Sequence, residues 1–519
     1  MALNEPIIEI NDIQGNSLAG FNKDFQDLLF FKITQPDTAK KWIRDLLPQI
    51  SSLNEVLRFN NLFKSLRVRL NGEDPPGLAA TWVNVAFTFE GLKKLVPEEA
   101  EHFKKDEAFS QGMAARSKVL GDRLDHQNWV IGGPTNLPDL LLIVASDKED
   151  LLNQRINSIK ESLKVNGGLE LIHEENGRTR MDTNKPGHEH FGYKDGISQP
   201  GIRGLKSDKQ EDFLTARLID PNDERAQKFS KPGAPLIWPG QFVLGYQKQN
   251  KNDLIQPAPA PDSDSDSDSA PDSDTLAGLP DWARNGSFLV FRRLQQDVAA
   301  FNKFVENMAA EVGMNSDLLG AKLIGRWKSG APLIRAKEED NPPIGNDAFT
   351  SNHFSYVNPE PAIKLTQAAD NQEIPGVEGD SEGKICPFAA HVRKLNPRDV
   401  RSAEFNRTKM LLRRGIPYGK SFELAPDEER GLLFMTYQAS IENQFEFMQQ
   451  AWANDIDFPS DLDGEDPIVG QKDNDGEKHT FKLPEKDKSI NFMQEWVTMT
   501  GGAYFFQPSI KALTDVLTV

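Results

Sequence analysis

One polar stretch in the first half of the chain is rich in the residue types that most often do chemistry. Residues 188–201 read HEHFGYKDGISQPG, with two histidines two positions apart and an aspartate between glycines. Three chemistries use such residues: a metal site on His188 and His190, a phosphate-binding loop, or a buried catalytic acid at Asp195. Which of the three applies would determine the function.

The metal and phosphate interpretations find little support elsewhere in the sequence. In an extended segment the rings of His188 and His190 would lie on one side, but a closed zinc site needs two more ligands. The chain's eight histidines and single cysteine supply no second cluster. A phosphate loop needs Lys-Ser or Lys-Thr after its last glycine, whereas GYKDG has neither. A zinc pair and an ordinary polar loop therefore both stay open.

Asp195 is the candidate for a catalytic acid. Glycines on both sides would let the backbone turn sharply and approach a ligand. If the carboxyl group is buried, desolvation would raise its pKa towards the range of a general base. The competing interpretation is a plain turn, because Asp-Gly is a common turn dipeptide.

A second region adds a histidine and two arginines. Residues 385–399 read ICPFAAHVRKLNPRD and place His391 after an apolar run, and residues 411–420 read LLRRGIPYGK. A neutral histidine beside apolar residues suits ligation of heme iron. Arginines nearby suit pairing with heme propionates, or stabilising the negative charge that develops when an O–O bond breaks. The alternative for His391 is a hydrogen-bonded core residue.

The two halves of the chain repeat a pattern of short apolar runs and helical segments. Such strand and helix units predict an α+β fold of two modules, each an antiparallel sheet with helices packed on one face. The matching segments are 27–33 and 287–294, 37–53 and 296–312, 82–96 and 431–452, and 140–146 and 501–509.

An acidic segment separates these halves. Residues 257–274 read PAPAPDSDSDSDSAPDSD and carry no large apolar side chain, which predicts a mobile insertion. The predicted organisation is therefore an N-terminal module over 1–250, the insertion over 251–276 and a C-terminal module over 277–519.

Composition excludes several partners. The net charge of −18 disfavours nucleic acid and acidic lipid, and no apolar run is long enough for a membrane helix. The first residues lack the pattern of a secretory signal, and Cys386 has no partner for an internal disulfide. We therefore expect a soluble, cytoplasmic protein that binds neither nucleic acid nor membranes.

Taken together, the motifs resemble those of the dye-decolorising peroxidases, most closely the long-chain branch with fungal and cyanobacterial members. The resemblance follows the chain in order and covers nearly all of it. The matching segments are DIQGN (12–16), FGYKDGISQPG (191–201), GRWKSGAPL (325–333), CPFAAHVRKLNPR (386–398) and RRGIPYG (413–419), followed by 431–454.

The resemblance implies two ferredoxin-like modules with one heme b per chain between them. His391 would be the axial ligand of the iron, Asp195 the distal acid and Arg413 the distal arginine. Asp466 would accept a hydrogen bond from the ligand histidine. Leu432 and Phe434 would be apolar pocket residues, since their spacing on a strand puts both on one face.

The implied activity is reduction of hydrogen peroxide to water through a ferryl intermediate, with one-electron oxidation of bulky dyes and of phenolic or other aromatic donors. An aspartate as proton acceptor predicts a rate that is best at acidic pH. Bulky dyes would react at surface aromatics, for which Tyr418 and Trp452 are the candidates.

Two other functions compete with the peroxidase. One is a heme-binding or iron-handling protein with little peroxidase turnover. The other is a thiolate-ligated heme oxygenase that uses Cys386. The resemblance leaves the number of subunits open.

Overall fold

In the computed structural model, the described residues are 5–122, 126–250, 276, 278–357, 363–364, 373–374, 377–398, 403–460, 462–472 and 478–519. The insertion predicted at 251–276 lies, apart from residue 276, outside these residues.

The first half forms a four-stranded sheet in the order β4-β1-β3-β2, with every neighbouring pair antiparallel. Helices α2 and α8 cover one face of this sheet, and each buries an apolar stripe there. This strand order with crossing helices is the ferredoxin-like arrangement. The elements are β1 (Phe25–Ile33), α2 (Pro36–Leu46), α3 (Leu53–Arg69), β2 (Thr81–Phe87), β3 (Leu140–Ser146), α8 (Glu149–Asn166) and β4 (Leu169–Arg178).

The second half repeats the arrangement with the strand order β12-β13-β8-β16, again antiparallel throughout. A short strand, β11, also pairs with β13. The elements are β8 (Ser287–Gln296), α9 (Val298–Val312), α10 (Ser316–Ile324), β11 (Leu412–Arg413), β12 (Ile416–Tyr418), β13 (Gly431–Gln438), the π-helical segments η8 (Ile441–Glu446) and η9 (Gln449–Ala453), and β16 (Val497–Gln507).

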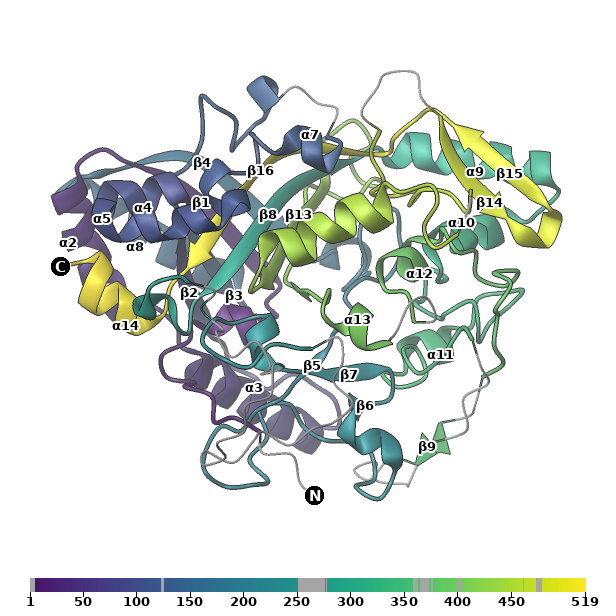
Figure 1. The fold of residues 1–519 in the computed structure, drawn as a ribbon, viewed down its shortest axis with the longest axis horizontal. Helices are drawn as coiled ribbons and strands as arrows, with labels where there is room; N and C mark the ends of the chain where they lie inside the picture. The colour runs from purple at the N-terminus through teal and green to yellow at the C-terminus, as the bar shows by residue number, and fades with distance from the viewer. Residues whose placement is uncertain are drawn as a thin grey trace, which may run out of the picture.

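Each half has its own antiparallel sheet, as predicted, and the two sheets are also joined to each other. Tyr418 of β12 pairs with Gly177 of β4, and Phe506 of β16 pairs with Phe87 of β2, so eight strands close into one barrel. The strands of this barrel run through the middle of Figure 1, from purple β1 to yellow β16. Each seam pairs an edge strand of one sheet with an edge strand of the other, which physically favours the joined form over two open modules.

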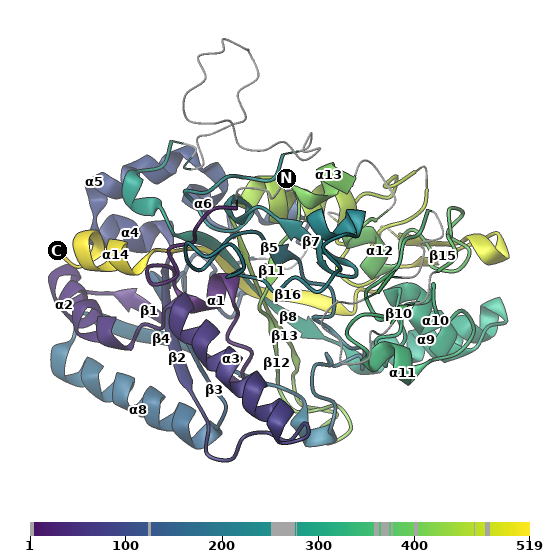
Figure 2. The same ribbon diagram turned by 90° about the horizontal axis from the view of Figure 1, so that it is seen from below.

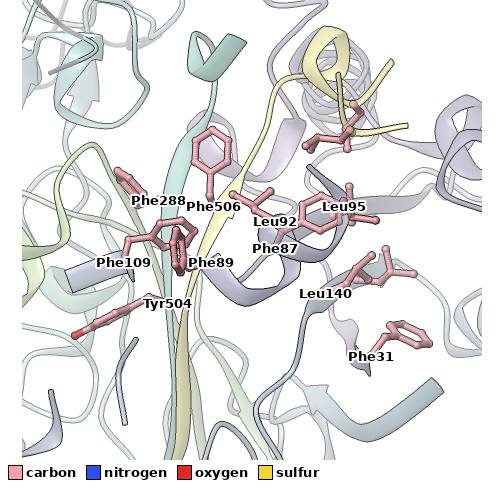
Figure 3. Close-up of a cluster of buried hydrophobic side chains, with 14 of the residues drawn as sticks. Phe31, Phe87, Phe89, Leu92, Leu95, Phe109, Leu140, Phe288, Tyr504 and Phe506 are labelled. Atoms are coloured by element: carbon pink, nitrogen blue, oxygen red, sulfur yellow. The ribbon is translucent and has the colours of Figure 1, made fainter. Parts of the chain in front are cut away.

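Apolar side chains fill both faces of the barrel wall. Leu28, Phe30 and Phe291 belong to the interior cluster. On the outer face of the first half, Phe31, Phe87 and Leu140 pack under the helices together with aromatic residues of β8 and β16, as Figure 3 shows. The outer face of the first half is thus a solid core.

Shorter elements surround the barrel: in Figure 1 α3, β5 and β7 lie below its strands, and in Figure 2, which views the molecule from below, α1 and α3 overlap the strands. None of the helices in the described part of the chain is long and apolar enough to cross a bilayer. The remaining elements are α1 (Gly15–Leu18), α4 (Phe89–Leu95), α5 (Pro97–Ala100), α6 (Glu107–Gln111), α7 (Ser117–Leu120), β5 (Gly201–Ile202), β6 (Phe229–Lys231), β7 (Ala234–Ile237), α11 (Pro342–Asn346), β9 (Ile363–Lys364), β10 (Glu373–Ile374), α12 (His391–Leu395), α13 (Ala403–Arg407), β14 (His479–Leu483), β15 (Lys488–Phe492) and α14 (Ile510–Ala512).

The seam between β4 and β12 yields a test of barrel closure. A Cβ at Gly177 would lie 2.3 Å from Ile416 Cγ2, so Gly177→Ala should lower the free energy of unfolding by about 1–3 kcal/mol. Ile416→Ala removes the obstructing methyl groups, so the double variant should lose less stability than the sum of the two single variants. Chemical denaturation measures all three. Strict additivity would contradict contact across this seam.

Candidate active site

A cavity of about 270 Å³ lies against the outer face of the second half's strands. Side chains at alternate positions of β8, β13 and β16 form one wall, while residues 189–200, α12 and η9 supply the others. In Figure 1, β8 and β13 lie at the centre of the molecule, with α12 to their right. The cavity therefore takes residues from both halves, but it lies over the second half's sheet and not at the seams of the barrel. The wall residues from these three strands are Arg292, Leu294, Gln296, Leu432, Phe434, Val497 and Met499.

His391 is the first residue of α12, and its ring lines this cavity. Nδ1 forms a 2.8 Å hydrogen bond with Oδ2 of Asp466, whose side chain is fully buried. The backbone N–H groups of Ile468 and Val469 donate to the other oxygen of Asp466, at 2.8 and 3.0 Å. With Nδ1 occupied in this way, Nε2 is the ring nitrogen left for a ligand in the cavity.

The carboxylate of Asp466 also acts on the protonation of the ring. Burial by itself would lower the pKa of His391, but the charge and the hydrogen bond of Asp466 outweigh burial and raise it. A partner of this kind increases the electron density on the opposite nitrogen and fixes the ring's orientation. The pair is thus arranged as metal-ligating histidines generally are.

Asp195 and Arg413 lie together on the wall of the same cavity. Arg413 Nη1 donates to Asp195 Oδ1 at 2.7 Å, and the Gly196 N–H donates to the same oxygen at 2.6 Å. Arg413 Nη2 also donates to the Ser198 carbonyl at 3.2 Å, which holds the guanidinium in place. The side chain of Asp195 is 44% accessible although it lies deep in the molecule, because its surface faces the cavity.

The direction of the Asp195 pKa shift differs from the sequence-based expectation. Burial raises this pKa, but the Arg413 guanidinium and the Gly196 N–H more than offset burial and hold it below the usual aspartate value. The expectation of a raised pKa considered desolvation alone, because a sequence does not show which cation folds against a carboxylate 218 residues away.

The loop that carries Asp195 is anchored by Glu189, a residue that the sequence analysis did not single out. The half-buried Glu189 carboxylate accepts hydrogen bonds from the N–H groups of Phe191 at 2.7 Å and Tyr193 at 2.8 Å, and from the amide of Gln296 at 2.6 Å. Its burial raises its pKa. Only the flanking glycines hinted at a sharp turn here, and Gly196 does have a left-handed φ of +74°.

The histidines of this stretch serve as backbone anchors. Both ring nitrogens of His188 bond to carbonyls, those of Pro186 and Lys328, and His190 Nε2 bonds to the carbonyl of Tyr418 at 2.8 Å. Within the described ranges no group of three His, Cys, Asp or Glu residues is placed to hold a metal ion. The structure thus favours the polar-loop interpretation over the zinc pair.

Arg326, within the GRWKSGAPL segment, adds a buried cation to the cavity wall. Its Nη1 donates to the carbonyls of Gly330 and Ser351, whereas its Nη2 is buried and has no hydrogen-bond partner among the described residues. Burial lowers the pKa of Arg326 to about 10. The Nη2 group of Arg326 is therefore placed to donate a hydrogen bond to an anionic group of a molecule bound in the cavity.

Cys386 does not line the cavity. Its thiol is buried beside the Tyr356 hydroxyl, at 3.8 Å, and burial raises its pKa to about 11. A neutral thiol outside the cavity does not fit the thiolate-ligated oxygenase.

The expectation that Tyr418 and Trp452 lie at the surface is wrong. Tyr418 is 5% exposed, points into the barrel from β12, and lies against the guanidinium of Arg293. Trp452 is 1% exposed, stacks on Phe458 and lines the cavity. The side-chain direction of Tyr418 follows from the alternation along β12, and the burial of Trp452 follows from the packing of η9. The resemblance to family motifs predicts neither.

Comparisons with known proteins agree with this geometry. The protein-family model of the DyP dimeric alpha+beta barrel domain matches residues 12–181. The family model of the Dyp-type peroxidase C-terminal domain matches residues 262–461. Dye-decolorizing peroxidase msp1 of Mycetinis scorodonius is 32% identical, over 99% of this chain and 88% of that protein. The multifunctional dye peroxidase of an Amycolatopsis species is 31% identical, over 99% and 97% of the two chains.

Solved structures show the same likeness. An ancestral D-type dye-decolorizing peroxidase is 30% identical and superposes with a TM-score of 0.74, over 99% of this chain and 100% of that one. The peroxidase of Auricularia auricula-judae is 28% identical, with a TM-score of 0.72 and the same coverage.

The closed barrel of two ferredoxin-like halves, with a histidine–aspartate pair and an acid–arginine pair on one cavity, defines the fold and site of a peroxidase. The chain belongs to the dye-decolorising peroxidase family, whose members depend on heme.

The Asp466–His391 pair can be tested through cofactor retention. Asp466→Asn removes the anionic acceptor at Nδ1, so transfer of bound heme to excess apomyoglobin should become about 10- to 100-fold faster. Asp487→Asn is the matched control, since residue 487 is exposed and asparagine tolerates its positive φ. Equal transfer rates in both variants would remove Asp466 from this role.

Proposed function

We propose that this chain is a heme peroxidase that binds one heme b in the cavity, reduces hydrogen peroxide to water, and oxidises bulky dyes and phenolic or other aromatic donors in one-electron steps. The observation that carries the proposal is that His391, Asp195 and Arg413, from three separate segments, line one cavity. Their combination supplies an axial ligand, a proton acceptor and a fixed cation in one place.

The residues of the cavity fit a heme. Apolar walls from the three strands suit a macrocycle, His391 Nε2 suits its iron, and the unpartnered Nη2 of Arg326 suits a propionate. When bound, the heme supplies the redox chemistry of its iron and porphyrin.

The protein's own part is to move a proton and to stabilise charge. Asp195 Oδ1 is engaged by Arg413 and Gly196, which leaves Oδ2 to accept a proton from one oxygen of hydrogen peroxide. Oδ2 then delivers the same proton to the other oxygen, so that the leaving group departs as water. Arg413 stabilises the negative charge that develops on the departing oxygen, and its bond to the Ser198 carbonyl keeps it oriented for this task.

The rival function, heme binding or iron handling with little turnover, has less support. Deferrochelatase of Shigella flexneri is 27% identical, but the match covers only 28% of this chain and 25% of that protein. An acid paired with an arginine beside the ligand histidine serves peroxide cleavage and is unnecessary for holding heme.

Substitutions of the acid–arginine pair test the peroxidase directly. Asp195→Asn should lower the rate constant for the reaction with hydrogen peroxide by about 10²–10⁴-fold, and Arg413→Leu by about 10²–10³-fold. Stopped-flow absorbance of the heme-loaded protein measures both, with heme content checked first. Asp37→Asn, at an exposed position of α2, is the control. Unchanged rate constants in both site variants would refute the proposal.

The pH dependence follows from the lowered pKa of Asp195. The proton acceptor must be ionised, and its folded pKa lies below the usual value of about 3.9. The rate constant with peroxide should therefore stay on its plateau from neutral pH down to about pH 4 and fall only below that, which replaces the sequence-based expectation of a rate that is best at acidic pH. Asp195→Asn should lack this acid limb. A midpoint above pH 5 in the wild type would contradict the assignment of Asp195 as the acceptor.

A further inference from the structure

A buried lysine follows the ligand histidine in α12 and takes no part in the cavity wall. Lys394 lies three residues after His391, and its side chain is fully buried. Its Nζ donates to three backbone carbonyls, that of Asp455 at 2.8 Å, that of Gly464 at 2.5 Å and that of Phe458. A lysine ammonium has three N–H donors, so all of them are used.

The three carbonyls belong to one loop, which we call the 455–464 loop and which is described apart from residue 461. Its last residue, Gly464, lies two positions before Asp466, the acceptor of the hydrogen bond from the ligand histidine. Lys394 therefore connects the helix that carries the histidine to the backbone that carries its carboxylate partner.

The ammonium group of Lys394 can stay buried only because the loop replaces its water. Burying an ammonium costs free energy unless its donors are bonded, and hydrogen bonds from a charged donor are stronger than those from a neutral one. Burial lowers the pKa of Lys394 to about 8, and Asp466 contributes the largest of the charges that oppose this shift. An apolar side chain of similar size would fill the same space without any bond to the loop.

The acidic residues around Asp466 are held by other groups. Glu465 pairs with Lys472, and Asp463 pairs with Lys482 at 3.5 Å. The backbone N–H groups that donate to Asp466 itself come from its own segment, two and three residues further on. The hydrogen bonds of Lys394 are thus a direct link between α12 and this segment.

We propose that Lys394 is a positioning residue, whose three hydrogen bonds hold the 455–464 loop on α12 so that Asp466 stays bonded to His391 Nδ1. The inference rests on the proposed function, in which His391 is the axial ligand of the heme iron. Lys394 acts through Asp466, because that carboxylate fixes the orientation of the ring and increases its electron density. Loss of the lysine should therefore resemble a partial loss of the carboxylate.

The heme-loaded protein allows a test that does not depend on turnover. Lys394→Met keeps the length of the side chain but removes its N–H donors. In the ferrous protein the iron–histidine stretching band of the resonance Raman spectrum should move to lower wavenumber, and the ferric/ferrous midpoint potential should rise. Both follow because a ring that loses its anionic partner donates less electron density to the iron. Heme transfer to apomyoglobin should become at least about tenfold faster.

The direction of the change in potential separates position from charge. If Lys394 acted through its charge alone, loss of a cation near the iron would favour the ferric state and lower the midpoint potential. Lys394→Gln keeps two N–H donors without the charge, so it should lie between the wild type and Lys394→Met in all three measurements. It also tests the proposal if Lys394→Met fails to fold.

A double-mutant cycle tests whether Lys394 acts through Asp466. The band position in Lys394→Met combined with Asp466→Asn should equal that in Asp466→Asn alone. Lys23→Met is the matched control, since Lys23 is a buried lysine of the first half that pairs with Asp147 and does not line the cavity. It should leave the band and the potential unchanged.

The outcomes separate this inference from the proposed function. An unchanged band in both Lys394→Met and Lys394→Gln, or a midpoint potential that falls, would overturn the positioning role and leave the peroxidase intact. A further shift of the band in the double variant would overturn it as well. A wild-type protein that binds heme without an iron–histidine band would refute His391 as the ligand, and with it both the proposed function and this inference.

Discussion

The rest of the structure depends on one constraint, the pairing of β8 with β13 on one side and with β16 on the other. Its hydrogen bonds to β13 and β16 hold the second half together, and the two seams to the first half close the barrel. Because strand side chains alternate, this one pairing sends Phe291 into the barrel and Arg292 and Leu294 outward. The outward-facing residues of β8 lie in the same cavity wall as the outward-facing residues of β13 and β16. The position of the cavity therefore follows from the register in which these three strands pair.

The two halves use the same architecture differently. In the first half, helices pack directly on the outer face and fill it with aromatic and aliphatic side chains. In the second half, the corresponding face is held apart from α12 and η9, and the space between them is the cavity. The first half therefore provides a packed hydrophobic core, and the second half provides the cavity. Stability and ligand binding depend on different parts of a single barrel.

Charged groups in the site are held by partners from distant segments. Asp195 and Arg413 are 218 residues apart, and His391 and Asp466 are 75 residues apart, yet each pair forms one short hydrogen bond. Backbone N–H groups also donate to both carboxylates, from Gly196 to Asp195 and from Ile468 and Val469 to Asp466. Such preorganised pairs need little rearrangement when a charged intermediate forms.

The sequence by itself determined the fold class, the repeat of two halves, and three residues that meet in the site, His391, Asp195 and Arg413. The strand predicted at 140–146 matches β3, and His391, Asp195 and Arg413 line one cavity, because apolar periodicity and ordered motifs are local properties of a chain.

Only the tertiary structure decided the remaining points: that the sheets join at Gly177 and Phe87, that Tyr418 and Trp452 are buried, and that Arg413 lowers the pKa of Asp195. These features depend on contacts between segments far apart in the chain. The distances and the burial that set their energies exist only after the barrel has closed.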